Sequence, residues 1–153
     1  IGEDGLPYVF RSLMGGVSAN RFGPQATTSN AMIWTILARL AGVDVTAGGG
    51  IWYENARSWA VSNRISDGVG PNNAVTREQL ATMLWNYRGS PAASYDLGRF
   101  GDRGQISTYQ AENALRWAVA NNIVSGSGNR LNPRGTATRA EVAAMITRFC
   151  QNT

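Results

Sequence analysis

A loop that runs into a capped helix start occurs three times in the sequence, and this repetition restricts the fold more than any other feature. The third copy, residues 133–142, carries Thr138 as an N-cap and Glu141 three positions later, which together form a capping box. Residues 69–80 match it at a constant offset of 62, and residues 22–30 match those at an offset of 47. Because the unit recurs, the sequence predicts a repeat fold.

A second segment with helical spacing lies before the second and third capped starts. Trp59 and Trp117 occupy the same position of this segment, at an offset of 58. The first copy keeps only part of the pattern, so its leading helix is truncated or degenerate, and the chain looks like an excised or mature fragment. The predicted repeats are residues 1–42, 51–89 and 100–150 of one domain covering residues 1–153.

Apolar residues at helical spacing follow each capped start, and no stretch alternates as a strand does. The fold class is therefore predicted as all-α, with a helix–loop–helix in each repeat. A further capping box is predicted from Ser107 to Gln110, whereas Met32 leaves the first copy without one. The predicted helices cover residues 6–13, 29–40, 51–63, 76–89, 107–122 and 139–149.

Composition excludes several functions. The chain has no His and a single Cys, so it offers no zinc-site spacing, no disulfide framework and no His-dependent nucleophile, and we expect no metal and no cofactor. Few acids are present and nothing pairs Asp67 with Asp102, so we expect no catalytic residues and no enzyme. All 14 basic residues are Arg and they are scattered, which disfavours a nucleic-acid partner, although the net charge of +4 suits an acidic polymer. No stretch is long and apolar enough to predict membrane insertion.

Arg77 and Arg139 follow their N-caps directly and are the candidate anion-binding residues. A helix start offers unpaired N–H groups and the positive end of the helix dipole, and the planar guanidinium suits a carboxylate or phosphate. The alternative is a surface Arg at a well-capped helix start. Trp59 and Trp117 likewise have two interpretations, either packing in the core or stacking on a sugar ring.

Several motifs resemble the S-layer homology domain family in its triple-repeat form. Residues 75–81 and 137–143 look like that family's Thr-Arg-Ala-Glu motif. Residues 117–126 are similar to the end of its leading helix, and residues 100–102 to its opening Phe-x-Asp. The resemblance implies a pseudo-trimeric, three-pronged spindle around a central helix bundle. It also implies an extracellular, non-catalytic module that anchors a protein to the bacterial cell wall or S-layer.

The resemblance further implies a ligand, an anionic and pyruvylated secondary cell-wall polysaccharide held in grooves between adjacent repeats. Asn30 replaces the motif Arg in the first copy, so we expect at most two functional grooves. The alternative is a structural or protein-interaction scaffold with degenerate sugar sites, with attached surface domains or self-assembly as possible partners. The ligand-binding residues assigned on this basis are Arg77, Arg139, Trp59, Trp117, Asp67, Asp102, Gly126 and Gly128.

Overall fold

The computed structural model describes residues 26–46 and 51–153, and within them the chain is helical. No strand longer than an isolated bridge occurs in these residues, so the all-α prediction is confirmed. The helix predicted over residues 6–13 lies outside the described residues. The elements are α2 (Asn30–Leu40), α3 (Glu54–Ser62), α4 (Arg77–Tyr87), the 3-10 helix η1 (Arg103–Gln105), α5 (Tyr109–Ala120) and α6 (Arg139–Asn152).

The N-caps set most of the helix starts as the sequence predicts. Thr76 and Thr138 each complete a full capping box, and α4 and α6 begin at the next residue. Ser29 caps α2 from one side only, as expected. The box predicted from Ser107 to Gln110 is wrong. Thr108 is the N-cap of α5 and accepts from the Ala111 N–H, whereas the Ser107 N–H donates to a carboxylate of α4.

Backbone hydrogen bonds join the three capped helix starts into a closed ring. The ring consists of isolated antiparallel bridges between the three segments, and each segment pairs with both others. In each copy, the N–H of the first helical residue donates to the same repeat position of a neighbouring copy. These bonds run from Asn30 to Asn73 (3.0 Å), from Arg77 to Gly135 (2.9 Å) and from Arg139 to Ala26 (2.7 Å).

The centre of this ring is fully buried. Thr28, Val75 and Ala137 occupy the same repeat position and are each 0% exposed. The Val75 N–H donates to the Thr28 carbonyl, and the Ala137 N–H donates to the Val75 carbonyl. The ring thus gives the three helix starts a cyclic arrangement at the core, while the three-pronged spindle stays a prediction.

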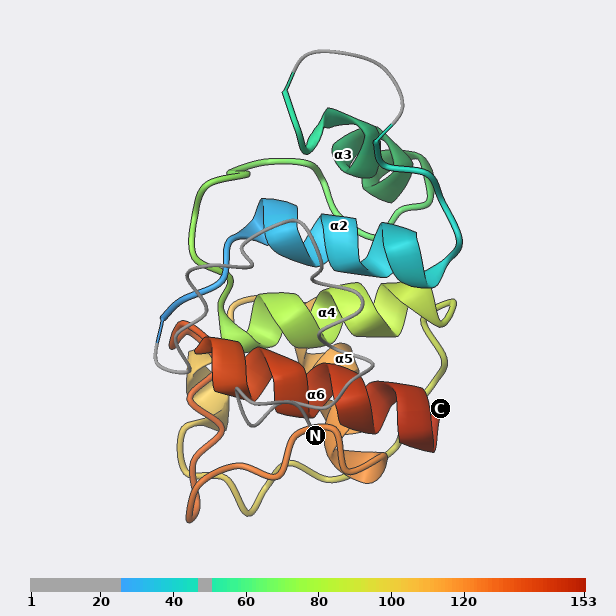
Figure 1. The fold of residues 1–153 in the computed structure, drawn as a ribbon. Coiled ribbons are helices and arrows are strands. Elements are labelled where there is room, and N and C mark those ends of the chain that lie inside the picture. Colours follow the sequence, from blue (N-terminus) through green and yellow to red (C-terminus); the bar gives the residue numbers. More distant parts are fainter. Residues whose placement is uncertain (1–25, 47–50) are drawn as a thin grey trace.

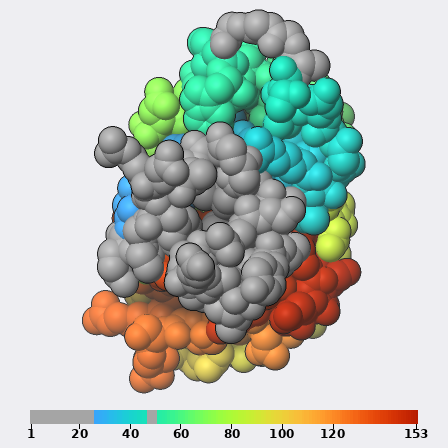
Figure 2. Space-filling model, in the orientation of Figure 1, coloured from blue at the N-terminus to red at the C-terminus, as the bar shows by residue number. Residues whose placement is uncertain are grey.

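Helices pack in pairs that cross the repeat boundaries. Helix α2 contacts α3, and α4 contacts α5, so the trailing helix of one repeat lies against the leading helix of the next. Figure 1 shows α4 between α2 and α6, with α3 at the end of the molecule next to α2. In the space-filling view from the same side, the segment after α2 and the end of α6 both reach the surface (Figure 2).

Candidate functional site

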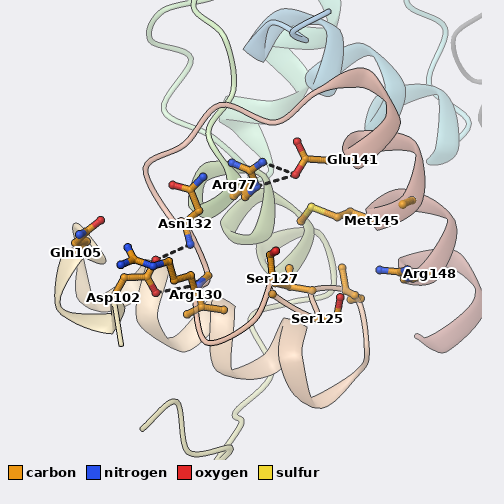
Figure 3. Close-up of a pocket in the computed structure, with 15 residues that line it drawn as sticks. Arg77, Asp102, Gln105, Ser125, Ser127, Arg130, Asn132, Glu141, Met145 and Arg148 are labelled. Atoms are coloured by element: carbon orange, nitrogen blue, oxygen red, sulfur yellow. Dashed lines mark hydrogen bonds and ion pairs between the residues drawn. The ribbon is translucent and has the colours of Figure 1, made fainter. Parts of the chain in front are cut away.

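A cavity of about 550 Å³ opens where the start of α4 meets α6 and the loop that follows α5. Helix α6 and the loop after α5, both in the third repeat, form its walls, while Arg77 of the second repeat reaches into it (Figure 3). Its charged lining residues are Arg77, Asp102, Arg130, Glu141 and Arg148. Three cations therefore face two acids in one concave space, a charge balance that suits an anion.

Arg77 lies at the first position of α4 and reaches across to α6. Its Nε donates to Glu141 Oε2 at 2.8 Å, and its Nη2 bonds to the same oxygen. The other oxygen of Glu141 accepts from the Thr138 N–H at 3.0 Å, as the capping box requires. Burial alone raises the pKa of Glu141, but the bonds from Thr138 and Arg77 outweigh it and hold this pKa below its ordinary value. An ionised Glu141 therefore fixes Arg77 at the cavity wall.

Arg148 and Arg130 complete the positive lining of the cavity. Among the described residues, the Arg148 side chain makes no hydrogen bond or ion pair, and it lies exposed on α6. Arg130 is exposed and acts electrostatically on Asp102. Neither residue was predicted from the sequence. Helical spacing gave a usable indication for Arg148, because it lies seven positions after Glu141 and so on the same face of α6.

Asp102 lines the cavity and holds the loop at residues 131–132 through hydrogen bonds. Its side chain is only 6% exposed, and it accepts from the Leu131 N–H at 2.9 Å and the Asn132 N–H at 2.8 Å. Burial raises the pKa of Asp102, yet these two backbone bonds, helped by Arg130, bring it below the ordinary value. The carboxylate is thus engaged with the loop backbone (Figure 3).

Gly126 lines the cavity, whereas Gly128 does not. Gly126 has φ +76°, and a Cβ there would lie 2.8 Å from Phe100 Cε1 and 2.9 Å from the Arg130 carbonyl oxygen. Gly128 also has a positive φ, of +61°, but a Cβ there would meet open space. Only Gly126 therefore lets the loop pass close to Phe100, which positions the cavity wall.

Arg139 stands at the repeat position of Arg77, in a different environment. It is 8% exposed, and burial lowers the pKa of its guanidinium. Its Nη2 lies 3.8 Å from Met32 Sδ, and Met32 holds the repeat position of Glu141. The side chain lines neither of the two cavities described here. By the repeat pattern, the helix side of an Arg139 groove falls on Met32, Ile36 and Arg39 of α2, while its loop side falls on residues before Ala26, outside the described residues.

Trp59 and Trp117 pack against aromatic residues of the trailing helices. The Trp59–Tyr87 ring centroids are 6.2 Å apart, and those of Trp117 and Phe149 are 6.1 Å apart. Tyr87 and Phe149 in turn lie edge to face, 5.7 Å apart, so the four rings form one chain across two repeats. Neither Trp lines the two cavities, so the geometry favours the packing interpretation.

A second cavity, of about 900 Å³, is the repeat equivalent of the first. Ile65 and Met83 occupy in it the places that Ile123 and Met145 occupy in the first. Asp67 lines it, and its Oδ1 accepts from the Val69 N–H at 3.0 Å. Each cavity thus takes one lining residue from the capped helix start of one repeat and most of the others from the following repeat, and the second cavity is also lined by Ser107, Thr108, Gln110 and Ala111 of the third repeat.

These features define a class of protein, a helical repeat domain with polar grooves at the junctions of its repeats. Residues 99–143 match the model of the S-layer homology domain. The chain is 31% identical, over 89% of its length, to an amylopullulanase of Thermoanaerobacterium thermosulfurigenes. It is 28% identical to exoglucanase XynX of Acetivibrio thermocellus over 89% of its length, and 28% identical to the surface-layer 125 kDa protein of Lysinibacillus sphaericus over 90%.

The chain carries an S-layer homology domain in residues 99–143. It spans only 8%, 14% and 13% of the lengths of those three relatives, which are much larger proteins. The match with this domain model makes it an extracellular, cell-surface domain of the kind that attaches proteins to the cell wall. Within the part of the chain that the structure describes, no helix has the length and apolar character needed to span a bilayer.

Proposed function

We propose that the chain is a non-catalytic anchor that binds an anionic, pyruvylated cell-wall polysaccharide at the junctions of its repeats. The observation that carries this proposal is the cavity in which Arg77, Arg130 and Arg148 face two acids that are already engaged. Glu141 is occupied by Arg77 and a helix cap, and Asp102 by two backbone N–H groups. Their charges are thereby offset locally, and the positive potential of the other two arginines faces the opening.

The ligand group best matched to this cavity is a carboxylate on a sugar ring. Arg77 uses Nε and Nη2 on Glu141, so its Nη1 is left to donate to a ligand. Arg148, which has no partner among the described residues, supplies a whole guanidinium fork. Each charge-assisted bond contributes about 1.5–3 kcal/mol, so two such contacts give useful affinity in a partly open groove.

The other assigned residues take supporting parts in this proposal. Asp102 and Gly126 hold the wall of the cavity, and Gly128 gives the same loop its second positive-φ turn. Asp67 belongs to the second cavity. Arg139 would serve a further groove closed by the first repeat, with repeat boundaries at residues 1–42, 51–89 and 100–150. Trp59 and Trp117 stay candidate sugar contacts, with a packing role as the alternative.

Cosedimentation with purified cell-wall sacculi tests the proposal. The wild-type chain should pellet with untreated sacculi and stay in solution after mild acid has removed ketal groups. Arg77→Gln should weaken binding about tenfold or more, as expected for the loss of one charge-assisted contact. Arg116→Gln is the matched control, because Arg116 also forms an ion pair, with Glu112, but lines neither cavity.

Equal binding by Arg77→Gln and the wild type would refute the site. Equal binding to acid-treated sacculi would refute the ketal ligand. Failure of the wild type to bind any sacculus fraction would instead favour a protein-binding scaffold. Far-UV circular dichroism of each variant checks that the helices are retained.

A further inference from the structure

The second cavity differs from the first in a concerted way. At three equivalent positions, charged residues of the first cavity are replaced by amides. Asn30 stands in place of Arg77, Gln79 in place of Glu141, and Asn86 in place of Arg148. The second cavity therefore lacks both the arginine and the glutamate that form an ion pair in the first. Because both are replaced together, no unpaired charge remains at these positions. The remaining charges of the second cavity are one arginine and two acids, against three arginines and two acids in the first.

The three amides are held in place by the protein and still have hydrogen-bonding capacity. Asn30 is 7% exposed and uses its Nδ2 on the Gly70 carbonyl at 3.0 Å, which leaves its Oδ1 as an acceptor. Gln79 uses its Oε1 on the Thr76 N–H at 3.0 Å, which leaves its Nε2 as a donor. Asn86 donates to the Ile65 carbonyl and accepts from Ser90. A preformed donor and acceptor pair thus faces one cavity.

We propose that this second cavity is a binding site for an uncharged saccharide. Amide donors and acceptors match the hydroxyl and acetamido groups of a neutral sugar, and the buried side chains of Ile65, Met83 and Trp85 give the ring an apolar surface to lie on. A carboxylate or phosphate is disfavoured, because Asp67 and Glu78 outnumber Arg64 in the lining. The domain therefore carries two junction sites of different selectivity, an anionic one at Arg77 and a neutral one at Asn30.

This site does not depend on the proposed anionic ligand, and the experiment keeps the two apart. The side-chain amide signals of Asn30 and Gln79 are followed in ¹H–¹⁵N spectra of the full chain. The probes are tri-N-acetylchitotriose and maltotriose, which are uncharged, and trigalacturonate, which is anionic. We expect at least one uncharged probe to shift these amide signals in a saturable way at concentrations up to about 10 mM, the range of a weak single-sugar site.

Two variants provide the controls. Arg77→Gln leaves the second cavity intact, so the neutral probe should bind it unchanged. The double variant Asn30→Arg/Gln79→Glu rebuilds the charged pair, and its cap is retained because Glu141 forms the same box in α6. Its affinity for the neutral probe should be at least fivefold lower than that of the wild type, and the variant should now respond to trigalacturonate. The proposal is overturned if neither uncharged probe shifts the two amides, or if trigalacturonate shifts them in the wild type as strongly as a neutral probe does.

Discussion

The ion pair between Arg77 and Glu141 is a side-chain contact that joins the second repeat to the third. Its partners lie 64 positions apart in sequence, on α4 and α6. Their side chains are 20% and 36% exposed, so the pair is partly screened by water. Double-mutant cycles on exposed pairs give about 0.2–1 kcal/mol, and because this pair is partly buried we expect a coupling of about 0.5–1 kcal/mol between Arg77→Gln and Glu141→Gln.

Glu141→Gln isolates the ion pair from the helix cap. Gln79 makes the same capping box at the start of α4, so a Gln at position 141 can keep the Thr138 N–H satisfied. The single variant should therefore lower the free energy of unfolding by about 1 kcal/mol, a shift of roughly 2–4 °C in Tm for a chain of this size. Urea unfolding followed by far-UV circular dichroism, on both single variants and the double variant, measures the coupling.

The coupling energy between Arg77 and Glu141 should decrease as pH falls. The pKa of Glu141 is lower in the folded chain than its ordinary value of 4.5. A carboxyl group with a depressed folded-state pKa stabilises the fold fully above its unfolded-state pKa and loses that contribution as pH falls through the folded-state pKa. The cycle should thus give its full coupling at about pH 7 and lose it progressively as pH falls through the folded-state pKa of Glu141.

The pair Arg116–Glu112 is the internal comparison. It lies within α5 at i, i+4 spacing, with Nη2 and Oε1 3.5 Å apart and side chains 26% and 30% exposed. A local pair of this kind contributes about 0.3–0.5 kcal/mol. The reasoning fails if the Arg77–Glu141 coupling at neutral pH is no larger than the Arg116–Glu112 coupling, or if it is unchanged in acid.

Three further substitutions test the parts of the fold that shape the site. Gly126→Ala should lower the free energy of unfolding by about 1–3 kcal/mol, because the added Cβ would clash with Phe100 and the residue has a positive φ. Gly128→Ala, which has a similar φ but open space around the Cβ, should lower it clearly less in the same urea titration. Thr138→Ala removes the cap of α6 and should cost about 1 kcal/mol; a cost near zero in urea would mean that the ring, not the cap, fixes the helix start. Phe149→Ala removes a ring that is 0% exposed and should cost about 3–5 kcal/mol by thermal unfolding, whereas Phe149→Leu should cost less than half as much.

Local features of this fold could be predicted from sequence because their causes are local. A Thr followed three residues later by Gln or Glu satisfies the first free N–H groups of a helix whatever surrounds it, so Thr76 and Thr138 are the N-caps of α4 and α6, as predicted. The start of α5 was displaced by one residue. Both Ser107 and Thr108 can act as an N-cap, but the Ser107 hydroxyl accepts from Arg134 Nε and its N–H donates to Glu78, both distant in sequence, while Thr108 caps the helix.

The features that could not be predicted from the sequence depend on contacts between residues far apart in the chain. The offsets show which residues are equivalent, but not that the N–H of Arg77 donates to Gly135 or that its side chain bonds to Glu141. The same limit explains why Arg139 looked identical to Arg77 in sequence. Met32 rather than a carboxylate stands at the position facing Arg139, and only the ring of helix starts brings those two residues together.

The ring also determines how the loss of a motif residue in one repeat affects the rest of the domain. Each groove takes its first helical residue from one repeat and most of its remaining lining from the next, so grooves correspond to junctions and not to single repeats. Asn30 therefore alters the groove walled by the second repeat, where Gln79 and Asn86 have changed with it. It leaves the Arg77 cavity, whose walls come from the third repeat, with its full set of charges. The two cavities share no lining residue, so the selectivity that we propose for the Asn30 junction can change without altering the proposed anionic site at Arg77.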